Sequence, residues 1–520
     1  MLPEVEQPQR DEHKRKVMNN KFDELTKSLT QSVTRRAALK KFGVGLAGMA
    51  LACSLSSPLR VTAATLGPLV ELSQPNPLAG CNSGFLPPGT MTLNDAAEPF
   101  IAVNPVHQNN MVAAWIGGDF QNVITAASFD GGLTWQQVPL PVTTCSSSQP
   151  YPGTGDPTLS FAPNGDLYAS VVVGFSFSAK LIATCKSTDG GRHWSAPTLM
   201  SPEVEPTNDG EVITADTTDA RLVYNSWTQS NVKNHSWIEF TRSTDGGQTW
   251  EPARTLFEPQ PQNFADDPQV FVMPDGALVM LYQFYTAQAN KPVLYSIGLL
   301  RSSDHGKTWS GPTQAFLTTP VLRPDGSGAA ATADPETGEP VNDHFSPIYA
   351  VDPRSGNLYV VWEEGRFSGF QYNDIAFSMS SDRGATWSAP IRINQTPLNI
   401  PAGNRQSFFA TVAVAANGTI GVSYYDFRFN TPAPGLPTDY WLVQCHPTPG
   451  APATNPANWG NEVRLTDSSF NMEACAILGD GFFLGDYFGL APVGGGGFVA
   501  AFSAVDQNNH TSIFARRVGQ

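Results

Sequence analysis

Apolar and polar residues alternate in the same order in seven segments of the chain. Each segment has a short apolar run, a turn rich in Gly, Asn, Asp or Pro, and a second apolar run. Apolar runs bounded by such residues are typical of β-strands, and turns such as PNGD, PDGA and ANGT are typical of hairpins. We therefore expect seven antiparallel strand pairs, in residues 98–115, 156–173, 210–227, 267–284, 346–363, 408–425 and 485–502.

An octapeptide with the pattern S-x-D-x-G-x-T-W follows each of the first five segments. This is the pattern of an Asp-box, or BNR, repeat. In such a turn the Asp accepts backbone N–H groups, the Gly takes a left-handed conformation and the Trp packs between sheets. We therefore interpret the Asp residues as structural and not as catalytic. The five copies are SFDGGLTW (Ser128–Trp135), STDGGRHW (Ser187–Trp194), STDGGQTW (Ser243–Trp250), SSDHGKTW (Ser302–Trp309) and SSDRGATW (Ser380–Trp387).

A further strand is expected after each of these Trp residues, which gives four strands per repeat. The sixth repeat carries a degenerate box that ends in Asn458-Trp459, and the seventh ends without a fourth strand. The segment Leu69–Leu72 belongs to no repeat, so we expect it to complete the last sheet and close a ring. The prediction is an all-β chain that forms a single β-propeller of seven four-stranded antiparallel blades. Six blades with a separate hairpin are the alternative.

The first 63 residues differ in charge from the rest of the chain. They hold 11 Lys and Arg against 6 Asp and Glu, whereas residues 64–520 hold 20 against 40. Arg35-Arg36 precede an apolar run from Phe42 to Leu55 and small residues up to Ala63. This resembles a twin-arginine export signal, and an N-terminal membrane anchor is the alternative. We therefore divide the chain into a signal region, 1–63, and a propeller, 64–520, that is exported to the periplasm, the cell surface or the medium.

The amino-acid composition and the net charge limit the classes of molecule that the protein can bind. The chain has 520 residues, 41% of them hydrophobic, and a net charge of −15. So much apolar material excludes wholesale disorder, and the acidic balance argues against nucleic-acid binding, which needs clustered Lys and Arg. No segment after residue 63 is apolar for long enough to span a membrane. We expect a monomer without a membrane span.

Five cysteines lie beyond the signal region: Cys81, Cys145, Cys185, Cys445 and Cys475. Export permits disulfides, but an odd number leaves at least one thiol unpaired. Spacing alone does not assign partners; Cys145–Cys185 and Cys445–Cys475 are possible local bridges. No Cys or His pair has the spacing of metal ligands.

Carboxylates recur where each repeat begins. In a propeller, the loops that lead into the first strand of each blade share one face with the loops between second and third strands. Carboxylates on this shared face would focus negative potential on a central funnel. Oxygen ligands from several blades could also hold Ca²⁺ there, although no calcium-loop motif is present. The lead-in residues are Glu98, Asp156, Asp209, Glu211, Asp266, Asp267, Asp343, His344, Arg405 and Asp486, and the second-to-third loops add Asp119, Glu363, Glu364, Arg366, Asp426, Arg428 and Asp506.

Repeated Asp-boxes on a propeller resemble the sialidase (neuraminidase) superfamily, from about residue 98 to the C-terminus. The resemblance implies an exo-glycosidase in which three Arg bind the substrate carboxylate, a Tyr paired with Glu is the nucleophile, and an Asp is the acid/base. Tyr487-Phe488-Gly489-Leu490 is similar to the family's Y-S-x-L segment. The first-blade segment Ala97–Ile101 lacks the Arg of the family's pattern, and the family's propellers have six blades.

These considerations give a set of candidate site residues. Tyr487, Asp486 and Asp267 are the catalytic candidates; Arg366, Arg405, Arg428 and Asp343 are the substrate-binding candidates. The Arg side chains would hold an anionic substituent bidentately. In the alternative interpretation, Glu364–Arg366 and Asp426–Arg428 are ion pairs within their own loops. We expect no cofactor and no metal, with Ca²⁺ as the alternative.

The sequence therefore predicts an exported sialidase-like glycoside hydrolase that acts on extracellular carbohydrate or glycoconjugates. The rival hypothesis is a propeller that binds glycans or proteins without catalysis, because the repeat specifies fold better than reaction.

Overall fold

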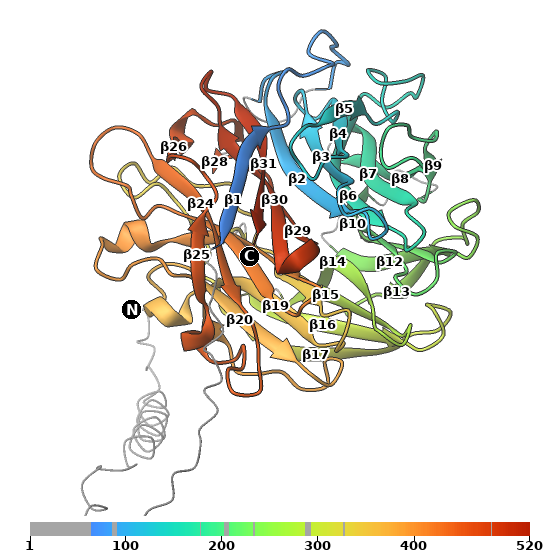
Figure 1. Ribbon diagram of the computed structural model, residues 1–520. Coiled ribbons are helices and arrows are strands. Elements are labelled where there is room, and N and C mark those ends of the chain that lie inside the picture. Colours follow the sequence, from blue (N-terminus) through green and yellow to red (C-terminus); the bar gives the residue numbers. More distant parts are fainter. Residues whose placement is uncertain are drawn as a thin grey trace, which may run out of the picture. The chain divides into compact units, whose positions relative to one another are not determined.

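The structure, a computed structural model, describes residues 64–85, 91–176, 178–201, 207–231, 235–286, 293–325, 328–479 and 481–519. The predicted export signal in residues 1–63 lies outside this part of the chain. The described residues form seven antiparallel sheets of a β-propeller, each with a path of four strands, and almost no helix (Figure 1). The first strands of neighbouring blades contact one another all the way round, so they form the innermost ring.

The first four blades follow the chain in order. Blade 1 contains β2 (Ala96–Val103), β3 (Met111–Gly117), β4 (Asn122–Ser128) and β5 (Gln136–Pro139). Blade 2 contains β6 (Gly153–Phe161), β7 (Leu167–Ser176), β8 (Ala179–Ser187) and β9 (Thr198–Leu199). Blade 3 contains β10 (Thr207–Ala215), β11 (Val223–Asn231), β12 (His235–Ser243) and β13 (Arg254–Phe257). Blade 4 contains β14 (Asn263–Val272), β15 (Leu278–Thr286), β16 (Leu294–Ser302) and β17 (Ser310–Thr318).

The last three blades are accompanied by short extra strands and 3-10 helices. Blade 5 contains β18 (Ile348–Val351), β19 (Leu358–Glu364), β20 (Asp374–Ser380) and β21 (Ile391–Arg392). Blade 6 contains β22 (Ser407–Val414), β23 (Ile420–Asp426), β24 (Pro437–Cys445) and β25 (Gly460–Arg464), with β26 (Phe470–Asn471) paired to β24. Blade 7 contains β29 (Gly489–Val493), β30 (Gly497–Val505), β31 (Thr511–Gly519) and β1 (Thr65–Glu71). Outside the blades, β27 (Ile477–Leu478) pairs with β28 (Gly481–Phe482), and short 3-10 helices are η1 (Arg366–Ser368), η2 (Ala402–Arg405), η3 (Pro456–Asn458), η4 (Met472–Ala474) and η5 (Gly494–Gly496).

The N-terminal strand lies in the last blade. β1 is antiparallel to β31, with Leu69 opposite Arg516 and Glu71 opposite Phe514. The blue and red strands β1 and β31 run side by side in Figure 1. The outer edge of β31 is therefore paired and not open to another chain.

Each Asp-box forms the expected turn. In the first box, Asp130 accepts hydrogen bonds from the backbone N–H groups of Leu133 (3.0 Å) and Thr134 (2.9 Å) and from the Thr134 hydroxyl (2.6 Å). Gly131 and Gly132 have φ of 79° and 93°, which only Gly adopts without strain. The structural interpretation of these Asp residues is thus supported by the geometry.

The Asp-box Trp residues connect neighbouring blades. The Trp194 indole N–H donates to the Thr125 hydroxyl of blade 1 at 3.1 Å, and Trp309 packs edge-on against Phe240 of blade 3 with ring centroids 5.4 Å apart. Trp459 of the degenerate sixth box packs against Phe377 of blade 5 in the same way, at 4.8 Å. Aromatic pairs of this geometry stabilise beyond the area that they bury.

The Asp-box turns predict how stability responds to acid. Hydrogen bonds from the turn lower the pKa of Asp130, Asp245 and Asp382 to about 2. A pKa lowered on folding contributes stability above the unfolded-state value, near 4, and this contribution is lost as the pH falls toward 2. We expect the melting temperature to fall steeply from pH 4 to pH 2. Asp245→Asn should be less stable than the wild type at pH 5, and its melting temperature should fall less between pH 4 and pH 2. A variant whose melting temperature falls as steeply as that of the wild type would contradict this explanation of the acid sensitivity.

The innermost strands share a bulge that directs carboxylates to the axis. The register of β2, β6 and β14 shifts at Glu98, Asp156 and Asp267, which have φ of 55°, 52° and 53°; Pro follows each of them. A bulge of this kind leaves one residue unpaired and redirects a side chain, and Pro suits it because it has no N–H to pair. Equivalent shifts occur in β10 and β22.

The disulfide differs from both local bridges considered above. Cys81 is bonded to Cys145, whereas Cys185, Cys445 and Cys475 are free and buried. The predictions Cys145–Cys185 and Cys445–Cys475 are therefore wrong. Cys185 lies in β8 with its side chain in the core between blades 1 and 2, and the partner of Cys145 is Cys81.

The Cys81–Cys145 bond should stabilise the propeller. It closes a loop with a sequence separation of 64 residues. Loops of this size give about 2–4 kcal/mol. We expect a reductant to lower the urea midpoint of the wild type to that of Cys81→Ser, and to leave the variant unchanged. A wild type that is insensitive to reductant would contradict the assignment.

None of the helices among the described residues is long and apolar enough to cross a membrane.

Candidate functional site

A first group of carboxylates comes from blades 1 to 3. Glu98, Asp156 and Asp209 lie on β2, β6 and β10 and interact directly with one another in that order. Burial, reinforced by the neighbouring carboxylates, raises the pKa of Glu98 and Asp156 well above its ordinary value. Burial thus favours the protonated forms of Glu98 and Asp156.

The pKa of Asp209 is shifted in the opposite direction to those of Glu98 and Asp156, because Lys180 of β8 lies next to it. Its ammonium nitrogen lies 2.5 Å from Asp209 Oδ2. Burial alone would raise the pKa of Asp209, but Lys180 outweighs it and lowers the pKa. Glu211 follows on the same strand; it is 1% exposed, neither carboxyl oxygen has a hydrogen-bond partner, and burial raises its pKa well above the ordinary value. This part of the site thus combines one carboxylate whose pKa is lowered with carboxyl groups whose pKa is raised.

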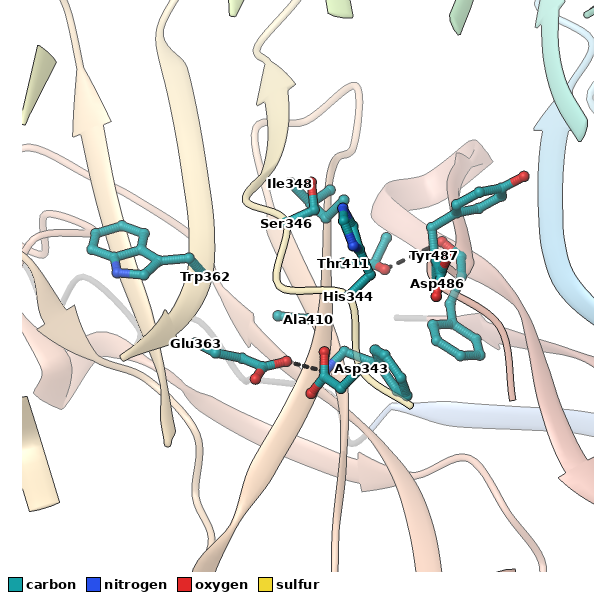
Figure 2. A pocket seen from close by; sticks show the side chains of 12 residues that line it. Asp343, His344, Ser346, Ile348, Trp362, Glu363, Ala410, Thr411, Asp486 and Tyr487 are labelled. Carbon is teal, nitrogen blue, oxygen red and sulfur yellow. Dashed lines mark hydrogen bonds between the residues drawn. The ribbon is translucent and has the colours of Figure 1, made fainter. Parts of the chain in front are cut away.

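A second group of carboxyls lies in blade 5. Asp343 precedes β18 and Glu363 lies near the end of β19; their side chains point toward one another in Figure 2. Burial raises the pKa of Asp343 to about 6 and that of Glu363 well above its ordinary value. Glu363 accepts a hydrogen bond from the Phe409 N–H (2.9 Å), which the bulge of β22 presents.

One oxygen of each partner, Asp343 Oδ1 and Glu363 Oε2, has no other hydrogen-bond partner. Two carboxyl groups that interact directly in a buried site are expected to share a proton, because both cannot ionise there. We call Asp343 and Glu363 the carboxyl pair.

The carboxyl pair lines a small pocket together with His344, Asp486 and Tyr487 (Figure 2). The pocket has a volume of about 10 Å³. This is the space that one water molecule needs, and polar groups on several sides supply the hydrogen bonds that a buried water requires. A sugar ring does not fit into it, so a substrate would lie above it on the lead-in face.

His344 and Asp267 are held next to each other above this pocket. His344 Nε2 lies 3.8 Å from Asp267 Oδ2, which also accepts a hydrogen bond from the Ser346 hydroxyl at 2.8 Å. Desolvation opposes the charge on His344, but Asp267 and Asp486 outweigh it and raise its pKa. Burial raises the pKa of Asp486, and His344 partly offsets this. Acidic groups from six blades thus surround one axis, which we call the carboxylate funnel: Glu98, Asp156, Asp209, Asp267, Asp343, Glu363 and Asp486.

Tyr487 separates the two groups of carboxyls. Its hydroxyl lies 3.5 Å from the Pro157 carbonyl oxygen, and its ring meets Phe100 edge-on at 6.4 Å. Burial, followed by the charges of Glu98 and Asp156, raises its pKa well above the ordinary value. The phenol is therefore protonated unless a neighbouring carboxylate takes its proton.

The three Arg candidates do not line the pocket. Arg366 pairs with Glu364 at 2.9 Å, and Arg428 pairs with Asp426 (2.7 Å) and Glu462 (2.6 Å) and stacks on Trp441 at 3.6 Å. Arg405 donates to the Ile400 carbonyl oxygen at 2.8 Å. The alternative interpretation of Glu364–Arg366 and Asp426–Arg428 as ion pairs within their loops agrees with these contacts.

The structure thus brings Asp267, Asp343, Asp486 and Tyr487 together and places the Arg candidates elsewhere. Sequence reasoning missed Lys180, because it considered loops, whereas Lys180 lies at the start of a third strand. The sequence assigns Asp343 and Glu363 to the same face but does not indicate that the two side chains contact each other. The described residues contain no group of three or more His, Cys, Asp or Glu that could hold a metal ion.

Comparison with known proteins identifies the repeat class. The model of the BNR/Asp-box repeat matches residues 241–252, which include the third octapeptide. The chain is thus an Asp-box repeat β-propeller.

A sialidase from Paraclostridium sordellii is 28% identical to this chain over 156 residues. The match covers 25% of this chain and 37% of the relative's length. A Hadza microbial sialidase is 14% identical with a TM-score of 0.44, over 79% of this chain and 73% of that one. An alpha-L-arabinofuranosidase from Fusarium graminearum is also 14% identical, with a TM-score of 0.41, over 65% and 91%. Structural similarity at this level does not show which activity this chain has.

Proposed function

We propose that the protein is a glycoside hydrolase whose reaction takes place in the carboxylate funnel. The observation that carries this proposal is that three acidic side chains, Asp343, Glu363 and Asp486, line a pocket of the size of one water molecule together with Tyr487. Glycoside hydrolysis requires one carboxyl that donates a proton to the leaving oxygen and a second group that activates or acts as the nucleophile. The partial match to a sialidase supports the same class of reaction.

The carboxyl pair is the proposed proton donor. The shared proton of Asp343 and Glu363 would pass to the glycosidic oxygen as the bond from that oxygen to the anomeric carbon breaks. A water in the pocket would add to the anomeric carbon and give its proton to Asp486, which lines the same pocket. Asp267, held by Ser346 and His344, is the second candidate base.

Tyr487 offers a second route, the one that the sialidase resemblance implies. Its hydroxyl would attack the anomeric carbon and pass its proton to Asp486, which lines the same pocket, while the carboxyl pair protonates the leaving oxygen as its bond to that carbon breaks. Water would then hydrolyse the covalent intermediate. Both routes need an ionised carboxylate next to the phenol or the water, and Asp486, which lines the pocket with Tyr487, is the group proposed for this role.

A panel of aryl glycosides of neutral sugars and a sialoside tests the proposal. We expect the wild type to hydrolyse at least one of them. Tyr487→Phe should lose activity by at least 100-fold if the phenol is the nucleophile and keep most of it if water attacks directly. No turnover of any glycoside by the wild type would refute the proposal that the protein is a glycoside hydrolase.

A non-catalytic glycan-binding propeller is the second candidate function. The small volume of the pocket favours it, because no sugar ring enters. It predicts glycan binding that survives both Glu363→Gln and Tyr487→Phe. We place either function outside the cytoplasm, on the basis of the export signal predicted in residues 1–63.

A further inference from the structure

We propose that a groove between the Asp-box turns of blades 1 and 2 binds carbohydrate, at a site separate from the carboxylate funnel. The groove has a volume of about 650 Å³, within the range of about 300–1,000 Å³ that is typical of ligand pockets. This inference goes beyond the proposed function, because it concerns a second site. We call it the Asp-box groove, and the side chains proposed to contact the ligand are His107, Asn109, Thr188 and Arg192.

The Asp-box groove lies at the end of the blades that carries the Asp-boxes. Its lining residues come from the turns β2–β3 and β6–β7 and from the first two Asp-boxes. In antiparallel blades these turns lie at the opposite end of the strands from the lead-in loops that form the carboxylate funnel. A ligand in the groove therefore does not compete for space with a substrate in the funnel.

A basic side chain crosses the three following junctions between blades, whereas this junction has an Ala in its place. In blades 2, 3 and 4, the residue before the Asp-box Ser donates to the carbonyl oxygen of the fourth residue of the next box: Lys186 to Gly246 at 2.8 Å, Arg242 to His305 at 2.6 Å and Arg301 to Arg383 at 3.0 Å. The corresponding residue of blade 1 is Ala127, and the Gly190 carbonyl oxygen accepts instead from the shorter Asn110 side chain, at 3.0 Å. The sequence thus leaves the junction of blades 1 and 2 open.

The turn that carries His107 and Asn109 is held in place at both ends. Asn104 Oδ1 accepts hydrogen bonds from the backbone N–H groups of Val106 (2.9 Å) and His107 (3.3 Å). The Asn110 N–H donates to the His107 carbonyl oxygen at 2.7 Å. The Asn104 and Asn110 side chains are bonded to each other at 3.0 Å, and each residue is only 3% exposed. A turn fixed in this way holds its other side chains ready for a ligand, which reduces the entropy lost on binding.

Three polar side chains of the Asp-box groove are available to a ligand. The His107 imidazole, the Asn109 amide and the Thr188 hydroxyl have no hydrogen-bond partner among the described residues. An amide, a hydroxyl and a neutral imidazole each offer both a donor and an acceptor. Sugar hydroxyls also donate and accept, so they match these groups better than an apolar ligand does.

Arg192 adds a cation of fixed orientation. Its guanidinium carbon lies 3.3 Å from the centroid of the Phe129 ring, and Nη1 donates to the Asp189 carbonyl oxygen at 3.2 Å. These contacts hold the plane of the guanidinium and leave Nε and Nη2 without a hydrogen-bond partner in the described part of the chain. Both nitrogens can donate to hydroxyl or ring oxygens of a sugar.

The Asp-box groove differs from the funnel in its charge. Asp189 is the one carboxylate among the described residues that line it, and the Asp-box turn engages both of its oxygens. Oδ1 accepts from the Arg192 and His193 N–H groups, each at 3.0 Å, and Oδ2 lies 2.6 Å from His193 Nδ1. The groups left for a ligand are therefore uncharged polar groups and one guanidinium, in contrast to the buried acids of the funnel.

An array of printed plant and bacterial oligosaccharides, probed with the full chain, tests the inference. We expect binding to at least one of them, weakened about tenfold by Arg192→Ala and by Asn109→Ala, because each removes hydrogen bonds to the ligand. Arg221→Ala is the matched control: this Arg, whose side chain is 77% exposed, lies in the turn β10–β11 at the same end of the blades, and its replacement should leave binding unchanged. Melting temperatures verify that the three variants are folded.

The outcomes separate this site from the proposed reaction. Binding to no printed oligosaccharide, or binding that survives both substitutions, would overturn the inference. Binding that is lost in Glu363→Gln but kept in Arg192→Ala would place the ligand in the funnel and overturn it as well. Binding that depends on Arg192, in a protein that hydrolyses no aryl glycoside, would refute the proposed hydrolase and leave the Asp-box groove as a binding site.

Discussion

Replacement of Glu363 by Gln is expected to lower kcat at least 100-fold on any glycoside that the protein hydrolyses. Gln keeps the hydrogen bond from the Phe409 N–H, because its amide oxygen accepts as the carboxylate does. It cannot share a proton with Asp343, so the proposed proton donor is lost. Positioned acids contribute about 10²–10⁴-fold to rate. Initial rates from pH 4 to pH 9 measure the effect, and the wild-type rate should fall on the alkaline side as the pair loses its proton.

The same variant should be more stable than the wild type at neutral pH. A carboxyl whose pKa is raised on folding binds its proton more tightly in the folded state, so its contribution to stability falls as the pH rises above the unfolded value, near 4. Gln does not titrate and avoids this loss. Urea unfolding at pH 4.5 and pH 7.5 compares the two proteins. A variant that is less stable than the wild type at pH 7.5 would show that Glu363 has a structural role. An unchanged kcat would show that Glu363 takes no part in the reaction.

Replacement of Arg428 by Ala is expected to cost about 3–5 kcal/mol of the free energy of unfolding. The guanidinium contacts Asp426 and Glu462 at 2.7 and 2.6 Å and covers the Trp441 ring. Its removal leaves the Asp426 carboxylate in the core of blade 6 without a counter-charge. Urea unfolding at pH 7 gives the value.

Arg366→Ala is the matched control. Its side chain is 34% exposed, so water can solvate part of the site that it vacates, and we expect a smaller loss. Equal losses would mean that burial does not distinguish the two ion pairs. An Arg428→Ala protein of wild-type stability that no longer binds glycans would restore Arg428 as a ligand residue and contradict its structural role.

The repeats made the architecture predictable. A turn with Ser, Asp, Gly, Thr and Trp at fixed spacing has local hydrogen bonds that do not depend on the rest of the chain, so each box could be identified from its octapeptide alone. Seven repeated strand pairs then determined the number of blades. The shared face followed from the topology, and the interactions among Glu98, Asp156 and Asp209 agree with it.

The protonation states and ion pairs could not be predicted in this way. Spacing in sequence does not reveal that Lys180 reaches the next blade to contact Asp209, nor that Glu462 reaches Arg428 from the outer strand of blade 6. The disulfide could not be assigned from sequence spacing for the same reason, since Cys185, which is closer to Cys145 in sequence than Cys81 is, is a buried core residue of a strand. Contacts between residues far apart in sequence depend on how blades meet, and a repeat pattern describes only the blade itself.

The pairing of β1 with β31 has a consequence for how the protein is made. The Arg516 side chain donates to the carbonyl oxygen of Gly67, a residue 449 positions earlier. During translation, β1 leaves the ribosome long before its partner strand exists, so blade 7 cannot be completed until synthesis is nearly finished. Contacts of this separation also slow folding. The nascent chain therefore keeps the β1 segment unpaired throughout elongation, which is the interval in which a chaperone or an export factor would find it accessible.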